Sequence, residues 1–223
     1  MVERVAQLLA GVLVIAALWV AWNWPSGPIP VGPAPGVAPP SEEQGPRLEL
    51  SSRAAVLMDD QSGRVLYAHN PHEPLPPASI TKLMTLMLAL EAVQQGKASM
   101  ADEVVASERA ASMGGSQVWL EVGERMPLRE LLYAIAVGSA NDASVAVAEH
   151  LAGSEGAFVE WMNRRARELG MRHTRFANST GLPPEETGGA GPHVASAYDL
   201  AVLSRQAIRT PGLLEMVSAW EFT

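Results

Sequence analysis

The spacing of apolar and polar residues divides the chain into three parts. Residues 5–24 contain no charged side chain, and this run is long enough to span a bilayer. Residues 25–47 hold eight prolines among glycines and other small residues, which predicts an extended linker without a core of its own. We therefore divide the chain into an N-terminal segment (1–24), a linker (25–47) and one globular domain (48–223).

The N-terminal segment is either a retained membrane anchor or a cleaved signal peptide. A signal peptidase site needs small residues at fixed positions, and Trp19 with Ala21 fits that requirement badly. Gly36 with Ala38 is followed at once by Pro39. We favour the anchor. A buried core helix fits less well, because the linker would separate it from the domain that it should stabilise.

Periodicity within the domain predicts a β-hairpin followed by a helix-rich region. The hairpin covers 55–67, and an irregular stretch with short strands is expected through Val122. Helices are predicted at 79–95, 128–137, 142–151, 155–169 and 196–208, with a last short helix opened by Pro211. Gly138 is expected to end the second of these helices, whose apolar stripe is Leu128, Leu131, Leu132 and Ile135.

Charge narrows the classes of partner. The net charge of −8 argues against nucleic acid, because phosphate binding needs a basic surface that the sequence does not show. Arg164, Arg165 and Arg167 are predicted to be the solvated face of an amphipathic helix.

The sequence predicts no metal site. It has no cysteine, and its five histidines do not show the spacing of metal ligands. The glycine-rich stretch 188–191 lacks a preceding strand, so we predict a loop there and no cofactor.

Lys82 is the first candidate for chemistry. It is one of only two lysines, and it lies among apolar residues at the start of a predicted helix. Ser79 precedes it by three residues, which places both side chains on one face of a helix. A serine becomes a nucleophile when a base accepts its proton, and burial lowers the pKa of a lysine towards that role. Ser79 and Lys82 are therefore a candidate nucleophile and base.

Ser139 and Asn141 form the second candidate group. They follow a predicted helix and precede another, so we expect an exposed, fixed turn. Ser139, Asn141 and Asp142 are all residue types that cap helices, and one of them is expected to cap the next helix. Capping explains one polar residue here, whereas the turn carries three. The sequence thus holds an SxxK motif followed by an SxN motif.

This order of motifs resembles the penicillin-binding proteins and serine β-lactamases, and among them the D-alanyl-D-alanine carboxypeptidases. The resemblance covers about Leu48 to Thr223. It includes the hairpin, Ser112-Met113-Gly114-Gly115-Ser116, Leu169-Gly170-Met171, Asn178 with Gly181-Leu182, and the segment HVASAYDLA at 193–201. It implies an α+β fold in which a helical lobe packs on an antiparallel sheet that is incomplete in this chain.

The resemblance also implies a reaction. Ser79 would attack the carbonyl that joins the two terminal D-alanines of a peptidoglycan stem peptide, and its own N–H would supply half of the oxyanion hole. Lys82 would accept the serine proton, Ser139 would relay it to the departing D-alanine, and Asn141 would bind the peptide of the substrate and Lys82. β-Lactams would be covalent inhibitors. The domain would work outside the cytoplasm, held at the membrane or secreted.

One motif of the family is absent from the sequence. The third motif, Lys-Thr-Gly or His-Thr-Gly on a strand beside the active site, does not occur before Thr223. We therefore expect a truncated gene product with impaired turnover, a natural remnant being the alternative. Two other functions stay open. A serine β-lactamase would need a loop glutamate, whereas Glu155 and Glu160 are predicted on a helix. A non-catalytic, membrane-tethered peptidoglycan-binding module would need no third motif.

Overall fold

In the computed structural model the described residues are 40, 48–189 and 191–219. The predicted N-terminal segment (1–24) and all of the linker (25–47) except Pro40 lie outside them. Within the described ranges, no helix is both long enough and apolar enough to cross a membrane. The described domain combines many helices with two small antiparallel sheets, which confirms the predicted α+β class.

Helices make up most of the domain. They are α2 (Lys82–Gln94), α3 (Glu108–Ala111), α4 (Leu128–Gly138), α5 (Asn141–Ala152), α6 (Glu155–Glu168), α7 (Pro184–Thr187), α8 (Ala197–Ala207) and α9 (Leu213–Val217). Serine side chains cap three of them by accepting a backbone N–H of the first turn, namely Ser107 for α3, Ser154 for α6 and Ser196 for α8. The longer predicted helices are confirmed within one or two residues, except at the start of α2. The short helices α3 and α7 were not predicted.

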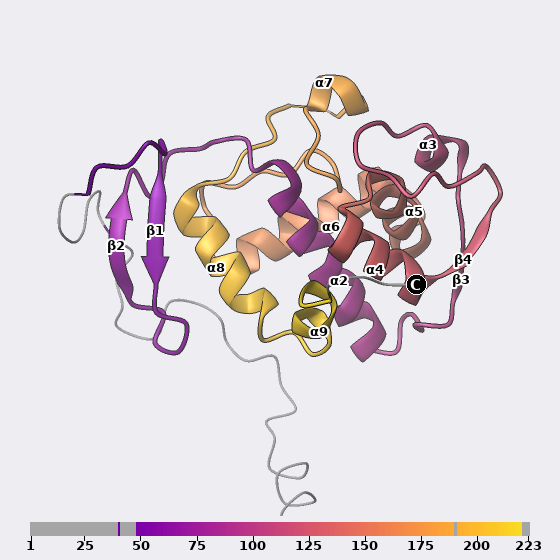
Figure 1. Cartoon of the computed structure of the whole chain (residues 1–223), viewed down its shortest axis with the longest axis horizontal. Coiled ribbons are helices and arrows are strands. Elements are labelled where there is room, and N and C mark those ends of the chain that lie inside the picture. The colour runs from indigo at the N-terminus through magenta and orange to yellow at the C-terminus, as the bar shows by residue number, and fades with distance from the viewer. Residues whose placement is uncertain (1–39, 41–47, 190, 220–223) are drawn as a thin grey trace, which may run out of the picture. The chain divides into compact units, whose positions relative to one another are not determined.

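Helix α2 is the centre of the core (Figure 1). It packs against α4, α5, α6, α8 and α9, and its Met84, Met87 and Leu88 have no solvent-exposed surface. A helix that is apolar on all sides is stable only when neighbours surround it. The prediction that this helix starts at Ser79 is wrong, because Ala78–Thr81 form a 3-10 turn that precedes it. Ala78 has a left-handed backbone there (φ 47°), which a regular helix start does not allow.

The predicted hairpin is confirmed. Strands β1 (Ala55–Met58) and β2 (Val65–His69) pair antiparallel, and β1 packs against α8. The turn between them is closed by the Asp59 carboxylate, which accepts the backbone N–H of Ser62 at 2.8 Å. Figure 1 shows the hairpin beside α8, at the opposite end of the domain from β3 and β4.

The second sheet differs from the prediction. It pairs β3 (Glu103–Val105) with β4 (Arg125–Pro127), so its second strand begins after Val122, where the strands were expected to end. Between the two strands the chain forms α3 and a long loop. Each strand has only three residues, which is too short for alternation to mark it. The loop that connects the two strands reaches the start of α5, where Asp142 accepts the N–H groups of Val118 and Leu120.

Candidate active site

Ser79 and Lys82 lie together where the 3-10 turn meets α2. The Lys82 Nζ donates a hydrogen bond to the Ser79 Oγ at 3.3 Å. The two side chains therefore lie side by side, as their spacing predicts. Ser79 is exposed, whereas the Lys82 residue is only 4% exposed. Burial lowers the pKa of Lys82 from 10.5 to about 8, because the interior disfavours the charged amine. The pair therefore combines an accessible hydroxyl with an amine that can titrate near neutral pH.

The backbone before Ser79 is held in place by a glycine from a distant loop. A Cβ built on Gly181 would lie 1.9 Å from the carbonyl oxygen of Ala78, so only glycine fits there. Ala78 itself has a positive φ, which is uncommon for a residue with a side chain. Such strain persists only where the surroundings fix it, and Gly181 is part of those surroundings. Contact with this loop therefore orients Ser79.

The same loop, 178–182, supplies the second partner of Lys82. The Nζ donates to the Thr180 carbonyl at 2.8 Å, and the Thr85 hydroxyl donates to the neighbouring Ser179 carbonyl at 2.8 Å. Two residues of α2 thus bind successive carbonyls of one loop. The sequence pattern did not predict these contacts, because backbone carbonyls have no residue signature and about 95 residues separate the partners. The signal was Gly181, which was noted without a role.

Two buried side chains hold loop 178–182. The Asn178 Oδ1 accepts the Gly181 N–H at 2.8 Å, which closes the turn. Glu155, 6% exposed, accepts both the N–H and the hydroxyl of Ser179, at 3.0 and 2.8 Å, and forms an ion pair with Arg109. Glu155 is the first residue of α6, so the prediction that it lies on a helix is confirmed. Its carboxylate stabilises the loop that binds Lys82, through the two hydrogen bonds from Ser179.

A buried histidine supports the turn from the other side. The His193 Nδ1 accepts the Ala177 N–H at 3.1 Å, which leaves the ring proton on Nε2. That proton is donated to the Thr81 hydroxyl oxygen at 2.8 Å. Burial lowers the pKa of His193 to about 4, so the ring is neutral at pH 7. The segment 193–201 therefore contributes to the site through Thr81, the neighbour of Lys82.

The SxN turn joins α4 to α5, but its details differ from the prediction. Gly138 is the last residue of α4, and Ser139 takes the left-handed conformation (φ 54°) that ends the helix. Asn141 is 3% exposed, so the expectation of an exposed residue is wrong for it. Its Nδ2 donates to the Gly114 carbonyl at 2.7 Å, and its backbone N–H donates to the Ser116 carbonyl at 2.8 Å. The loop before it buries the amide.

The expectation of a side-chain cap on α5 is also wrong. The N-cap is Ala140, which has no capping side chain, and Asp142 faces the preceding loop. The Asp142 carboxylate, 1% exposed, accepts the N–H groups of Val118 and Leu120, each at 3.1 Å. The three polar residues of this turn therefore have separate tasks, because Asn141 and Asp142 fix the loop while Ser139 forms the turn.

The structure brings the two motifs to neighbouring elements without joining them. Helix α2 packs against both α4 and α5, which meet at the SxN turn. Within the described part of the chain, no hydrogen bond joins Ser139 or Asn141 to Ser79 or Lys82. Among the described residues, the hydrogen bond that joins two of the predicted site residues is the one between Lys82 and Ser79.

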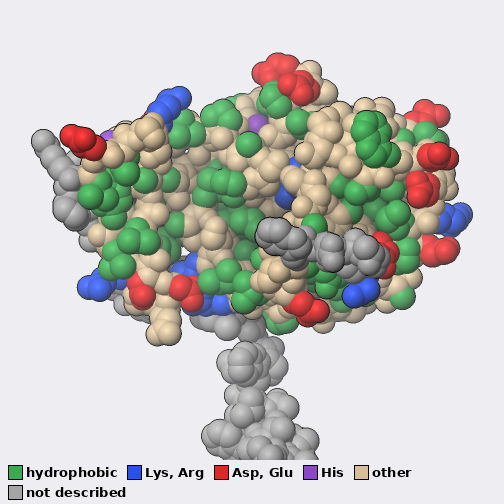
Figure 2. Space-filling view, in the orientation of Figure 1, with side chains coloured by type: hydrophobic (Ala, Val, Ile, Leu, Met, Phe, Trp, Pro, Cys, Tyr) green, Lys and Arg blue, Asp and Glu red, His purple; other side chains and the backbone are tan. Residues whose placement is uncertain are grey.

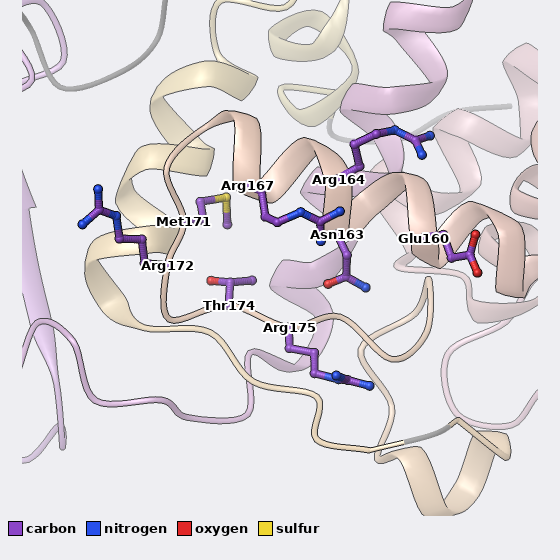
Figure 3. Close-up of a pocket in the computed structure, with 8 residues that line it drawn as sticks. All are labelled: Glu160, Asn163, Arg164, Arg167, Met171, Arg172, Thr174 and Arg175. Atoms are coloured by element: carbon purple, nitrogen blue, oxygen red, sulfur yellow. The ribbon is translucent and has the colours of Figure 1, made fainter.

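A surface hollow lies in a different part of the molecule. It encloses about 620 Å³ beside α6 and the segment after it, and is lined by Glu160, Asn163, Arg164, Arg167, Met171, Arg172, Thr174 and Arg175. Figure 3 shows Arg164 and Arg172 pointing away from its centre. The Asn163 amide and the Thr174 hydroxyl are already used within the protein, by Phe176 and Asp199. None of the four candidate catalytic residues lines this hollow.

The prediction of a solvated arginine face holds for two of its three residues. Arg164 and Arg167 are exposed, whereas Arg165 is partly buried and forms ion pairs with Glu91 at 2.8 Å and Glu168 at 3.3 Å. The pair with Glu91 links α6 to α2, which explains why this arginine does not face solvent. Arg165 is thus a structural residue of the core boundary.

The surface carries scattered charges. On the face seen in Figure 2, acidic side chains gather over α7 and near β3 and β4, while basic side chains are dispersed. This distribution agrees with an acidic protein that presents no broad basic surface on that face. Among the residues that the structure describes, no group of three or more His, Asp or Glu could hold a metal ion.

Comparison with known proteins points to one family. Residues 40–222 match the family described as D-alanyl-D-alanine carboxypeptidase. The carboxypeptidase DacF of Bacillus subtilis is 46% identical over 174 residues, which are 78% of this chain and 43% of that protein. DacD of Escherichia coli is 36% identical over 206 residues, or 88% of this chain and 48% of its relative. The chain thus spans less than half the length of these curated relatives.

Solved structures show the same likeness. Penicillin-binding protein 3 of Streptococcus pneumoniae, described as a peptidoglycan synthesis regulatory factor, superposes with a TM-score of 0.74 at 31% identity, covering 79% of this chain and 52% of that one. Penicillin-binding protein D2 of Listeria monocytogenes, solved with ampicillin bound, gives a TM-score of 0.68 at 31% identity, covering 78% and 69%. The described fold is therefore that of a penicillin-binding protein.

Proposed function

Since the chain belongs to the D-alanyl-D-alanine carboxypeptidase family, we propose that its domain removes the terminal D-alanine from peptidoglycan stem peptides through an acyl-enzyme on Ser79. The observation that carries this proposal is the 3.3 Å contact between Ser79 and the buried amine of Lys82. An exposed hydroxyl beside a lysine with a pKa of about 8 is the arrangement that serine acylation needs.

The proposed reaction has two steps. The Ser79 Oγ attacks the carbonyl carbon between the two D-alanines while Lys82 accepts the hydroxyl proton. The C–N bond then breaks, the terminal D-alanine leaves with a proton on its nitrogen, and the shortened peptide remains esterified to Ser79. Water hydrolyses the ester, which restores the serine and releases the peptide. The Ser79 N–H contributes to the oxyanion hole.

Ser139 and Asn141 have supporting roles in this proposal. Ser139 relays the proton to the leaving nitrogen, as in the family, and its position at the junction of two helices that flank α2 supports that role. Asn141 binds the peptide of the substrate and Lys82. One N–H of its amide is already donated to Gly114, so the remaining N–H and the carbonyl oxygen are the groups left for these partners.

β-Lactams are proposed to acylate the same serine. Their strained amide resembles the D-alanyl-D-alanine bond, and the relative D2 was solved with ampicillin and with cefotaxime. The alternative of a serine β-lactamase lacks support, because Glu155 is engaged by Arg109 and Ser179 and cannot activate a water there. Glu160 lines the hollow beside α6. The remaining alternative is a peptidoglycan-binding module without catalysis. The Ser79→Ala variant described below distinguishes it from an enzyme.

The proposed location follows from the proposed substrate. Stem peptides belong to the cell wall, so the domain would work outside the cytoplasm. The uncharged run at residues 5–24 would hold it at the membrane, and the proline-rich linker would hold it off the bilayer. If the run is cleaved instead, the domain is secreted.

The test is D-alanine release by the full chain from a peptide ending in D-alanyl-D-alanine. The wild type is expected to release D-alanine, and Ser79→Ala to lose this activity by at least about 10³-fold while still binding peptidoglycan. Ser62→Ala, which alters an exposed serine of the β1–β2 turn, is the control and should retain activity. A wild type that binds peptidoglycan but never releases D-alanine would favour the binding module.

A further inference from the structure

Trp119 combines two unfavourable features in one residue. Its side chain is 77% exposed, more than any other large apolar residue of the described domain. Its backbone is left-handed (φ 63°), which is an outlier for a bulky residue. Exposed apolar area and backbone strain both cost stability, and strain of this kind collects at binding and catalytic sites.

The surrounding structure imposes this conformation. The buried Asp142 carboxylate accepts the N–H groups on both sides of Trp119, those of Val118 and Leu120, at 3.1 Å. Leu120 is 5% exposed, so the residue after Trp119 is buried in the domain. Gly123 then donates its N–H to the Ala106 carbonyl at 2.8 Å. The indole therefore projects from a fixed loop.

This loop is bound to the SxN turn. Asn141, the residue before Asp142, holds the Gly114 carbonyl with its side chain at 2.7 Å and the Ser116 carbonyl with its backbone at 2.8 Å. Asp142 directly follows Asn141, and adjacent Cα atoms are about 3.8 Å apart, so the backbone on both sides of Trp119 is bound by the residue next to Asn141. A substrate bound by Asn141 would pass close to the indole.

The chemistry of the substrate decides which part of the stem peptide can contact the Trp119 indole. Only one D-alanine follows the scissile bond, so a contact beyond the leaving group must involve the acyl side. The sugar chain is less well placed, because an extended stem peptide of five residues separates the scissile end from the glycan by up to about 17 Å. The occupant is therefore a side chain of the peptide, and an indole face favours an apolar one.

We propose that Trp119 forms an apolar subsite that contacts an aliphatic side chain of the stem peptide on the acyl side of the scissile bond. This inference rests on the proposed function and names the part of the substrate that the loop recognises. The subsite selects peptides by the length of that side chain, while Ser79 and Lys82 carry out the reaction.

The test compares two substrates, both capped and ending in D-alanyl-D-alanine. One carries acetylated lysine before the D-alanines and the other carries alanine. In the wild type, kcat/KM is expected to be higher for the lysine peptide. Trp119→Ala should lower the ratio of the two kcat/KM values about tenfold, the low end of what one methylene is worth in an apolar pocket. Trp119→Phe should preserve most of the ratio, and Leu214→Ala, an equally simple loss of exposed apolar surface on α9, should leave it unchanged.

Stability provides a second readout. Trp119→Gly relieves the left-handed strain, so its Tm should equal or exceed that of the wild type, whereas loss of a packing residue would lower it. An unchanged ratio in Trp119→Ala, or a loss seen only with a disaccharide-bearing peptide, contradicts the subsite while D-alanine release stands. A wild type that releases D-alanine from neither peptide and takes no penicillin on Ser79 contradicts the proposed function, and the subsite with it.

Discussion

At the scale of single residues, the site depends on how strongly Lys82 is buried. Its pKa of about 8 lies 2.5 below the ordinary value of 10.5, because burial disfavours the charged amine. Among the described residues its hydrogen-bond partners are Ser79 and the Thr180 carbonyl, neither of which is charged. At pH 7 about a tenth of the amine is neutral, and the fraction rises to half at pH 8. Only this neutral form can accept the proton of Ser79.

The rate of penicillin acylation should therefore rise with pH, with a midpoint near 8. Lys82→Ala should slow acylation by about 10²- to 10⁴-fold. Lys97→Ala removes the other lysine, which is exposed, and should leave the midpoint in place. A rate that stays flat between pH 6 and pH 9 would contradict the role of Lys82 as base.

The same shift has a consequence for stability. The folded pKa lies below the unfolded one, so the unfolded chain binds more protons between about pH 8 and 10.5. The free energy of unfolding contributed by Lys82 therefore rises with pH across that window. It is lower below pH 8, where the folded state holds a charged amine in its interior. The neutral fraction of the Lys82 amine and its contribution to the free energy of unfolding thus both increase with pH.

Sequence spacing was sufficient for the Ser79–Lys82 pair but not for its surroundings. Three residues on a helical path fix the distance between two side chains, so the contact could be expected. The carbonyl of Thr180, the ring of His193 and the loop bound by Asp142 depend on tertiary contacts between distant segments. Asp142 was interpreted as a possible cap, because the same residue type serves both purposes.

At the scale of elements, loop 178–182 is the part that positions the site. It joins Ala78 through Gly181, Lys82 through Thr180, and α6 through Glu155. Gly181 is the tightest of these contacts.

Gly181→Ala is expected to lower the rate of acylation by more than its loss of stability alone would explain. The added Cβ would meet the Ala78 carbonyl oxygen at 1.9 Å, so the turn that carries Ser79 must move. We expect acylation to fall about 10²-fold, since small misplacements of a nucleophile have effects of this size. Stopped-flow acylation with a chromogenic cephalosporin measures it.

Gly170→Ala provides the matched control. Gly170 also has a positive φ (77°), but an added Cβ would meet nothing within 4 Å. Both substitutions should lose about 1–2 kcal/mol from backbone strain, and Gly170→Ala should keep its acylation rate. Equal rates in the two variants would show that the contact with Ala78 does not position Ser79.

Element prediction was reliable where periodicity is long and failed where elements are short. The stripe Leu128, Leu131, Leu132 and Ile135 is buried as expected. The three-residue strands and the four-residue helices span less than two hydrophobic periods, too few for a repeat to show in the sequence, so tertiary contacts define them. The start of α2 was misplaced because a strained Ala78 left no signal in the sequence pattern.

At the scale of the whole molecule, three distant regions meet around the N-terminal end of α2. The 3-10 turn brings Ser79, loop 178–182 brings backbone carbonyls, and segment 193–201 brings His193. The helical lobe holds them because α2 is buried on all sides. The chain spans 43% and 48% of the length of two curated relatives.

The most direct measurement is to trap the full chain from its own cells with a labelled penicillin, digest it and locate the adduct by mass spectrometry. The account predicts a covalent adduct on the peptide that contains Ser79, at one label per chain, and none after Ser79→Ala. A folded chain that takes no label, or that carries it on another residue, would contradict the acyl-enzyme proposed here.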